Sequence, residues 1–546
     1  MLSKLYFDPF LKILIELKDE INYKIDLKPT SFIKIASFGL FGVTVIYLSK
    51  VWYAQRLFKR LGIKTPKFRF FFGNLPEILE NTQSNMLQKW TKELGKTYGY
   101  YEGHLPILVT SDCDTIQEVF IKQYSNFIAR KQYPFQFADN SPKMDLFLST
   151  NKRWKRMRNI INPTFSPAKL KELLPIMKKC TNRFLEILEK NLDKEIIISD
   201  YLNRYTMDTI WNSATGMDIN CQTNESPYME KALLVFKDLE HLKFAFRITS
   251  YLNEFRPFIL QLLTIQTYLM SKFQNNDFVD PLFWLTQHIH KIIEERKLNN
   301  IKRKDFTQLL MDTRIEDNEL LKRLEKVDLS KFRLDKQMSF EEIEFNLVGF
   351  LLAGFETTSS ALNYCFYVLA NHPNETIKLQ EELDVFFSEQ TELDFENINS
   401  LEYLDMFVKE VLRMYPISSN TVNRRCMYST KVKDMEIPAG VSVTVDVLSL
   451  HYDQEYWGPI DPNEFYPLRF SSEIKRNQAV YLPFGLGPRN CVGMRYALME
   501  MKMALAKILK KYDVLPSENT PKSLDYVEGT VRRPKNNIPI ILKSRN

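Results

Sequence analysis

The segment from Phe484 to Gly493, near the C-terminus, has the pattern F-x-x-G-x-R-x-C-x-G. Its glycines permit a tight loop, and that loop presents a single cysteine, Cys491. One thiolate on such a loop can approach a flat, metal-bearing ring from one side, while Arg489 pairs with an acidic group on the ring. This is how a thiolate is presented to haem iron. The pattern therefore predicts a chain that folds around a haem.

The composition is that of a large, mostly helical globular protein. Of 546 residues, 45% are apolar, with 39 Phe, 26 Tyr and only 16 Gly. The formal net charge of +7 is small for this length and no basic repeat is present, so no nucleic-acid partner is expected. The cysteines include no C-x-x-C pair, which argues against a structural zinc site and fits a reducing compartment.

A membrane anchor is predicted near the N-terminus. The uncharged run from Ile35 to Ser49 is short for a bilayer span, which needs about 20 residues. Residues 32–53 give a full span, in which Lys34 and Lys50 lie near the ends and can reach the headgroups. No small-residue cleavage site follows, so we expect an anchor over residues 31–53 and not a removed signal. A buried core helix is the alternative.

The charges around this span predict its orientation. On its C-terminal side the chain is basic, with no acid before Glu77, whereas the charges on the N-terminal side are balanced. The positive-inside rule then places the C-terminal bulk in the cytosol. Residues 1–30 have apolar residues at helical spacing, and this leader either lies on a membrane surface or packs on the body. A basic, proline-bearing linker over residues 54–70 leads into a catalytic domain over residues 71–546.

Residues 339–371 are predicted to form a long helix. Ser339 and Glu342 make a capping box at its start, and His372 with Pro373 ends it. Two strands joined by a turn are predicted over residues 98–103 and 107–110, and helical periodicity dominates the following part of the chain.

Small residues interrupt the middle of this long helix, where Ala353 and Gly354 precede Glu356 and Thr357. Glycine inside a helix costs roughly 1 kcal/mol relative to alanine. Two small residues beside an acid and a hydroxyl would open space on one helix face. The alternative is a helix-packing notch in which the threonine bonds to its own backbone.

Two further patterns place charged residues at helical spacing. Glu410 and Arg413 lie three apart in a mostly apolar stretch, and a partly buried pair of this kind needs further partners. Trp154 and Arg158 share one helix face, so an indole N–H and a guanidinium can reach the same carboxylate. A surface basic helix is the alternative for the second pattern.

Taken in order along the chain, these patterns resemble the cytochrome P-450 family over residues 64–540. The segment around Cys491 resembles the cysteine-ligand loop of that family. Residues 462–470 resemble a segment whose arginine, here Arg469, completes a salt-bridge triad with Glu410 and Arg413. The resemblance implies a mainly α fold with small β-sheets, in which haem lies between the long helix and the Cys491 loop.

The resemblance also implies which residues hold haem b. Arg424 matches a ring-pairing arginine by its distance from Pro438, although it is one residue out of register when counted from Pro416. Cys491 is the implied iron ligand. The full implied set is Trp154, Arg158, Ala353, Gly354, Arg424, Phe484, Gly487, Arg489, Cys491 and Gly493.

The implied activity is that of a monooxygenase, which inserts one oxygen atom of O2 into an apolar organic substrate such as a lipid, sterol or xenobiotic. Thr357, backed by Glu356, would relay protons through water. One alternative is a haem-thiolate isomerase or dehydratase acting on peroxides, whose members usually lack the acid–alcohol pair. The other is a non-catalytic haem binder or sensor, which needs no proton relay.

Electrons must come from another protein, because no Gly-rich nucleotide fingerprint or flavin domain is visible. The resemblance implies an NADPH-dependent flavoprotein reductase at the endoplasmic reticulum membrane, with cytochrome b5 as a further candidate donor. A basic cluster beside Trp154 is a candidate docking site, and a generic solvated face is the alternative. The cluster consists of Lys152, Arg153, Lys155 and Arg156.

Residues that precede Trp154, lie on the long helix or follow Pro416 suggest an apolar, aromatic-lined substrate pocket. Each of them taken singly is equally an ordinary core or loop residue. The candidates are Tyr133, Phe135, Phe137, Phe355, Ser418, Ser419, Asn420 and Thr421.

Overall fold

The computed structural model describes residues 29–134, 136, 141, 143–240, 244–273, 280–313, 337–390 and 392–545. The chain divides after Leu57 into two compact units, residues 1–57 and 58–546. The expected amphipathic leader falls on residues 1–28, outside the described residues, except that Pro29 and Thr30 begin the first helix. The candidate pocket residues Phe135 and Phe137 also lie outside the described residues.

Among the described residues, the first unit contains the helix α2 (Pro29–Ala54), which covers the predicted anchor. Its segment Ser37–Ala54 has a mean hydropathy of 1.2, and α2 is the one described helix that is long and apolar enough to cross a membrane. Large apolar side chains on α2, such as Phe38 and Phe41, are exposed. The helix is therefore long enough to span a membrane, and its exposed side chains are apolar, as in a membrane span.

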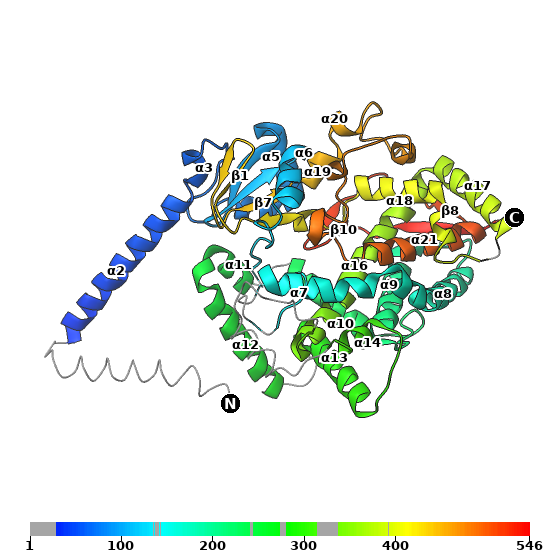
Figure 1. Cartoon of the computed structure of the whole chain (residues 1–546), viewed down its shortest axis with the longest axis horizontal. Helices are drawn as coiled ribbons and strands as arrows, with labels where there is room; N and C mark the ends of the chain where they lie inside the picture. The colour runs from blue at the N-terminus through cyan, green and yellow to red at the C-terminus, as the bar shows by residue number, and fades with distance from the viewer. Residues whose placement is uncertain are drawn as a thin grey trace. The chain divides into compact units, whose positions relative to one another are not determined.

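The described part of the second unit is mainly helical, as expected from the sequence (Figure 1). The α-helices after α2 are α3 (Leu57–Arg60), α4 (Leu75–Glu80), α5 (Gln83–Leu94), α6 (Cys113–Gln117), α7 (Asn151–Ile161), α8 (Pro167–Glu189), α9 (Ile198–Thr215), α10 (Pro227–Glu240), α11 (Phe244–Tyr251), α12 (Arg256–Phe273), α13 (Pro281–Leu298), α14 (Phe306–Met311), α16 (Phe340–Asn371), α17 (Pro373–Glu389), α18 (Glu402–Met414), α19 (Val447–His451), α20 (Gln454–Trp457) and α21 (Met494–Lys511).

Short 3₁₀ segments and one π-helical turn, η1, connect these helices. They are η1 (Glu118–Lys122), η2 (Asn162–Phe165), η3 (Asn253–Phe255), η5 (Asn397–Asn399), η6 (Ser419–Thr421), η7 (Pro467–Phe470), η8 (Gln478–Val480) and η9 (Gly487–Arg489). The strands are β1 (Thr97–Glu102), β2 (Leu105–Thr110), β3 (Glu195–Ile197), β4 (Asn423–Arg425), β5 (Thr430–Val432), β6 (Met435–Ile437), β7 (Ser442–Val445), β8 (Tyr512–Pro516), β9 (Tyr526–Glu528), β10 (Arg532–Pro534) and β11 (Pro539–Ser544).

The strands form small sheets, the largest of which has the order β1-β2-β7-β4. β1 and β2 are antiparallel with Tyr98 opposite Val109, which confirms the predicted strand pair. β7 adds parallel to β2 and antiparallel to β4, so it joins the two parts of the chain that flank the helical region. The smaller sheets are β3-β11-β8, β9-β10 and β5-β6. The prediction of a mainly α fold with small β-sheets is confirmed.

The long helix α16 organises the second unit. Ser339 Oγ accepts from the N–H of Glu342, and the Glu342 carboxylate accepts from the N–H of Ser339, so the predicted capping box is confirmed. The helix ends at His372, and Pro373 begins α17, also as predicted. α16 contacts α9, α13, α18 and α21, and it passes through the interior of the unit (Figure 1). Side chains on α16 can therefore reach a central cavity.

Candidate active site

Cys491 closes a tight loop that begins at Phe484. The N–H of Cys491 donates to the carbonyl oxygen of Phe484 at 2.8 Å. Gly487 has a φ of +73°, and a Cβ added there would lie 2.0 Å from the carbonyl oxygen of Phe120. Only glycine fits this turn. Helix α21 begins directly after the loop, at Met494.

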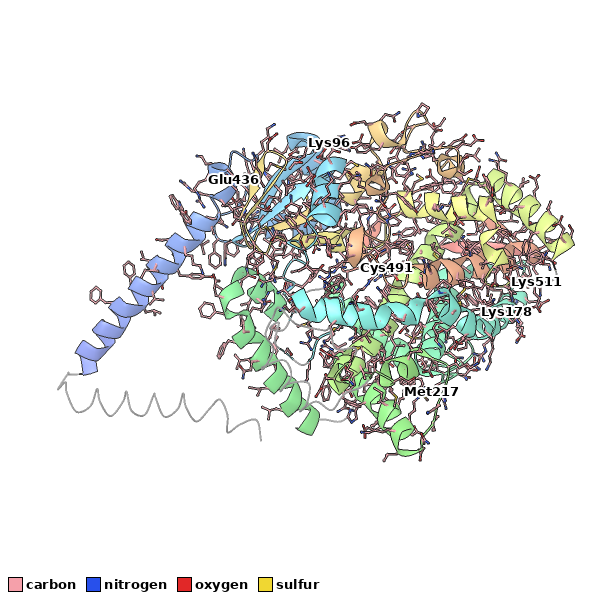
Figure 2. All side chains as sticks on the ribbon, viewed as in Figure 1. Lys96, Lys178, Met217, Glu436, Cys491 and Lys511 are labelled. Carbon is pink, nitrogen blue, oxygen red and sulfur yellow. The ribbon has the colours of Figure 1, made fainter. Side chains whose placement is uncertain are left out.

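The Cys491 loop, α7 and α16 enclose a cavity of about 410 Å³. Cys491 is exposed to this cavity although it lies well inside the second unit (Figure 2). Burial raises the pKa of its thiol, and the N–H of Gly493, the guanidinium of Arg158 and the N–H of Met494 oppose that rise. The loop therefore supplies donors that favour a thiolate, but the pKa stays above its ordinary value until a metal ion adds its charge.

Four arginines line the same cavity. Burial lowers the pKa of each guanidinium, and neighbouring guanidinium groups lower it further for Arg158, Arg424 and Arg489. Among the described residues, no carboxylate forms an ion pair with any of the four. They are held instead by loop carbonyl oxygens, in the pairs Arg130–Thr421, Arg158–Asn490, Arg424–Leu486 and Arg489–Ser149.

Several N–H groups of this arginine cluster have no acceptor among the described residues. They are Nε of Arg130, Nε of Arg158 and Nη1 of Arg489, and all three atoms are buried. Buried charge without a partner is strongly destabilising. A ligand with two carboxylates, facing a thiolate, would satisfy these groups, and haem has that chemistry. The residues present therefore fit a haem held by the arginines and by Cys491.

Arg130 is a member of this cluster that sequence reasoning missed. It belongs to no motif, and it precedes Trp154 by a long loop. An isolated β-bridge between Ala129 and Arg425 brings it next to Arg424. The structure also shows which of the two adjacent arginines of β4 faces the cavity. Arg424 lines the cavity, whereas Arg425 is not among its lining residues. Only the tertiary structure reveals this pairing of distant segments.

Trp154 and Arg158 of α7 both line the cavity, so their predicted common face is turned toward it. The Arg489 guanidinium lies over the Trp154 ring at 4.8 Å. Phe484 also lines the cavity, whereas Gly487 and Gly493 are outside its lining and shape the loop. Seven of the ten residues predicted to surround the ring thus line one cavity, namely Trp154, Arg158, Ala353, Arg424, Phe484, Arg489 and Cys491.

Ala353 and Thr357 of α16 also line the cavity. Thr357 Oγ1 donates to the carbonyl oxygen of Ala353, which is the back-bonded geometry expected of a threonine inside a helix. The back-bonded threonine stated above as an alternative is therefore present, although Ala353 and Thr357 also line the cavity. The neighbouring Thr358 lines the cavity as well.

Two expectations about α16 are wrong. Gly354 was expected to open space for a ligand, but a Cβ added there would lie 2.6 Å from Cδ1 and Cγ1 of Ile210. The glycine therefore allows α9 to approach α16. Phe355 was expected in the pocket, but it is fully buried and lies beside the ring of Phe236. A helix turns by 100° per residue, so only some members of the notch can face the cavity.

Glu356 is buried but does not line the cavity. Its Oε1 lies 3.3 Å from Nε of Arg533, on β10, and forms an ion pair with it. The acid and the alcohol are thus neighbours in sequence but lie on different sides of the helix. Any proton transfer between them needs water or a side-chain movement.

The expected triad forms in the protein interior. Arg413 donates to both carboxylate oxygens of Glu410 at 2.7 and 2.8 Å, and Arg469 Nε donates to Oε1 at 3.2 Å. Glu410 and Arg413 have no exposed surface, and Arg469 has 2%. Further N–H groups donate to carbonyl oxygens, including His451 O from Arg413 and Trp457 O from Arg469. The triad therefore ties α18 to the segment that precedes the Cys491 loop.

The other predicted pocket residues divide into two groups. Ser418 and Thr421 line the cavity. Ser419 and Asn420 do not, because Ser419 Oγ bonds to Glu528 and Asn420 Nδ2 donates to Gly529 O. Tyr133 is buried outside the lining, where its hydroxyl accepts from Asn423. The cavity wall includes residues not predicted, namely Asp145, Leu146, Phe147, Leu148, Asn346, Gly349, Phe350, Leu352, Ile417 and Val531.

The basic cluster of α7 is not one surface. Arg156 is 3% exposed and its Nη2 lies 2.5 Å from Glu342, at the start of α16. Arg153 also pairs with Glu342, at 2.9 Å. Lys152 and Lys155 are exposed. Two of the four residues therefore fix α7 to α16, and the expectation of a four-residue docking cluster is wrong.

Comparison with known proteins agrees with this geometry. The family model for cytochrome P450 matches residues 63–541. A Caenorhabditis elegans cytochrome P450, CYP13A3, is 36% identical over 502 residues, which cover 89% of this chain and 94% of the relative. Cytochrome P450 3A29 of Sus scrofa is 33% identical, covering 90% and 92%. Lithocholate 6-beta-hydroxylase of Mesocricetus auratus is also 33% identical, with the same coverage. This chain belongs to the cytochrome P450 family of haem-dependent monooxygenases.

Proposed function

We propose that this protein is a membrane-anchored monooxygenase that oxygenates an apolar organic molecule, namely a lipid, sterol or xenobiotic. The observation that carries the proposal is the single cavity shared by Cys491, the arginine cluster and the α16 residues Ala353 and Thr357. The rest of the wall is largely apolar, with few polar groups, as is typical of sites for apolar small molecules. One similar protein is named as a hydroxylase, which supports oxygen insertion as the reaction.

In this proposal the haem supplies the activation of O2 and the insertion of one oxygen atom. Cys491 would hold the iron, whose charge would favour the thiolate, and the N–H groups of Gly493 and Met494 favour the same form. The N–H groups of the arginine cluster that have no acceptor among the described residues would hold the two haem carboxylates, with the Trp154 indole as a further donor.

Thr357 and Glu356 would deliver protons from the α16 side. The Thr357 hydroxyl can exchange its acceptor, Ala353 O, for a water molecule in the cavity, since both residues line that space. Glu356 is tied to Arg533, whose side chain is 36% exposed and thus connects the pair to solvent. A proton would then pass from solvent through Glu356 and water to Thr357.

The location proposed is the endoplasmic reticulum membrane, with α2 as a single-pass anchor and residues 71–546 in the cytosol. The exposed apolar surface of α2 and the basic residues that follow it support this orientation. Electrons would come from an NADPH-dependent flavoprotein reductase, with cytochrome b5 as a second donor. Lys152 and Lys155 are exposed cations of α7 whose positive charge would attract an acidic partner.

The iron ligand is tested by replacing Cys491 with serine. Reduced wild-type protein with carbon monoxide should show the far-red-shifted Soret band of thiolate ligation, and Cys491→Ser should lose that band. Cys113→Ser is the control, because Cys113 is buried outside the cavity lining and its replacement should leave the band intact. Retention of the band in Cys491→Ser would show that another residue is the ligand.

The reaction class is tested by reconstituting the protein with the reductase. A monooxygenase should consume NADPH and O2 when an apolar substrate is present. Turnover of a lipid peroxide without NADPH would favour the isomerase alternative. Haem binding with neither activity would favour the sensor alternative.

A further inference from the structure

The side chain of Asn490 belongs to the Cys491 loop, but neither the sequence pattern nor the proposed chemistry gives it a role. Asn490 fills the variable position between Arg489 and Cys491, and it lines the cavity. Its backbone N–H donates to the carbonyl oxygen of Gly487 at 3.0 Å, within the preceding turn. The backbone of Asn490 therefore helps to close the loop, and its side-chain amide is left for a different contact.

Both oxygen atoms of Asn490 accept hydrogen bonds from Arg158 of α7. Arg158 Nη1 donates to the carbonyl oxygen of Asn490 at 2.7 Å, and Arg158 Nη2 donates to Oδ1 at 2.8 Å. A guanidinium is planar and its N–H groups form a fixed fork, so two contacts with one residue define its orientation. With the backbone contact alone, the group could turn about a single hydrogen bond.

The contact with Asn490 leaves another edge of Arg158 for a ligand. The guanidinium carries more N–H bonds than these two contacts use. Nε is buried and has no acceptor among the described residues. Nε and the second hydrogen of Nη2 form an edge that matches the two oxygens of a carboxylate. Because Nη2 belongs both to this edge and to the Asn490 contact, the amide oxygen that holds Nη2 also orients the edge.

The same contact keeps a positive charge beside the predicted iron ligand. Burial raises the pKa of the Cys491 thiol, and the charge of Arg158 opposes that rise. Helix α7 is itself held at the start of α16, where Arg156 pairs with Glu342. The Arg158 guanidinium therefore connects a helix that is held in place with the Cys491 loop, and Asn490 is the residue of the loop that it contacts.

We propose that Asn490 is a positioning residue for haem, whose side-chain oxygen orients Arg158 so that Nε and Nη2 bind one haem carboxylate. This inference rests on the proposed function, because it assumes that haem lies beside Cys491. It adds that carboxylate binding on α7 depends on the residue next to the iron ligand. Haem release should then depend on Asn490 through Arg158.

The test measures the rate at which haem leaves the haem-loaded protein, by transfer to an excess of apomyoglobin. Asn490→Ala removes the acceptor of Nη2 but keeps the backbone contact of Nη1. Haem release should be about tenfold faster than in wild type, the lower end for loss of one hydrogen bond to a charged group. Asn490→Asp keeps an acceptor oxygen at the same place, so its release rate should be close to that of wild type.

A double-mutant cycle separates the orientation of Arg158 from a general effect on the loop. Arg158→Met removes the guanidinium, and the other cavity arginines remain to hold haem. In this background Asn490→Ala should change the release rate by less than about twofold, since no guanidinium remains to be oriented. Asn463→Ala is the control, because Asn463 is exposed, lies outside the cavity lining and contacts Asp461. It should leave haem release unchanged.

Three results would overturn the inference. Release from Asn490→Ala at the wild-type rate would show that the amide does not orient Arg158. An equal acceleration in the Arg158→Met background would assign Asn490 to the loop alone. Release from Asn490→Asp as fast as from Asn490→Ala, or loss of haem from both variants, would show that the acceptor oxygen is not responsible.

An Asn490→Ala protein without haem, beside a haem-loaded Asn490→Asp, supports the inference as fast release does. A normal carbon monoxide band in wild type leaves the proposed function standing in every case. A wild-type protein without that band refutes the proposed function and the inference together.

Discussion

At the scale of single residues, the site contains several buried polar groups that have no partner among the described residues. The arginine cluster has three buried N–H groups without acceptors among the described residues, and the Cys491 thiol has a pKa raised by burial. Haem would satisfy both needs, since it brings two carboxylates and a metal ion. These side chains destabilise the protein when no ligand is present, so haem binding should stabilise the fold.

Proton delivery can be tested at Thr357. Thr357→Val keeps the shape but removes the hydroxyl, so haem content should hardly change. Product formed per NADPH consumed should fall and hydrogen peroxide should rise. One acid–base group contributes about 10²–10⁴-fold, and water can replace part of it. Thr206→Val is the control, because Thr206 is similarly back-bonded, to Leu202 O, on α9. If Thr357→Val and Glu356→Gln both leave the ratio unchanged, the relay is wrong.

Glu500 on α21 provides a test of stability against pH. It has no exposed surface, and neither carboxylate oxygen has a hydrogen-bond donor among the described residues. Burial raises the pKa of Glu500 well above its ordinary value, and the nearby Thr209 hydroxyl, which donates to Tyr205 O, lowers it only in part. The folded protein therefore holds a proton that the unfolded chain releases. This stabilisation is complete below the unfolded pKa and is lost as pH rises through the folded pKa.

Glu500→Gln should remove that pH dependence. At neutral pH the variant should be more stable than wild type by about 1–3 kcal/mol, because an amide replaces a carboxyl that is costly to ionise. The measurement is the thermal unfolding midpoint between pH 5 and pH 8. Glu230→Gln, at a side chain that is 66% exposed, should follow wild type. Parallel curves for wild type and Glu500→Gln would show that Glu500 is not the titrating group.

At the scale of elements, the approach of α9 to α16 decides which residues of α16 face the cavity. The two helices touch at Gly354, where the Ile210 side chain of α9 occupies the space that a Cβ would fill. The rotation of α16 that this contact fixes turns Ala353 and Thr357 toward the Cys491 side. The packing of one glycine thus orients the functional face of the helix.

Because Gly354 contacts Ile210, the effect of Gly354→Ala on the free energy of unfolding should change sign when Ile210 is also replaced. Gly354→Ala alone should destabilise the protein by about 1–2 kcal/mol, because overpacking outweighs the gain in helix propensity. In an Ile210→Ala background the same change should be stabilising by up to about 1 kcal/mol, since the obstructing side chain is gone. Denaturant unfolding measures both values. Additive effects would mean that the two residues do not touch in solution.

At the scale of the whole molecule, α2 belongs to a separate unit from the residues that form the cavity. Deleting residues 1–53 should therefore release the protein from alkaline-washed membranes and leave haem bound. The measurements are sedimentation after carbonate washing and the haem absorption spectrum. A full-length protein that is already soluble after washing would contradict the anchor.

The amino-acid sequence by itself determined those features that depend on neighbours along the chain. The capping box at Ser339, the loop turn at Gly487 and the pairing of Glu410 with Arg413 each require only a few residues at fixed spacing. Local sterics and helix periodicity fix such features, so a pattern is enough to predict them. The same patterns predicted the fold class and several residues of the cavity wall, among them Trp154, Arg158 and Cys491.

Only the tertiary structure decided which faces and loops meet. It excluded Gly354 and Phe355 from the cavity, brought in Arg130 and Asp145, and buried Arg156 against α16. These outcomes depend on the rotation of packed helices and on contacts between segments far apart in sequence. No short pattern in one amino-acid sequence predicts such contacts, because their energy arises from close packing and from charges that the fold brings together.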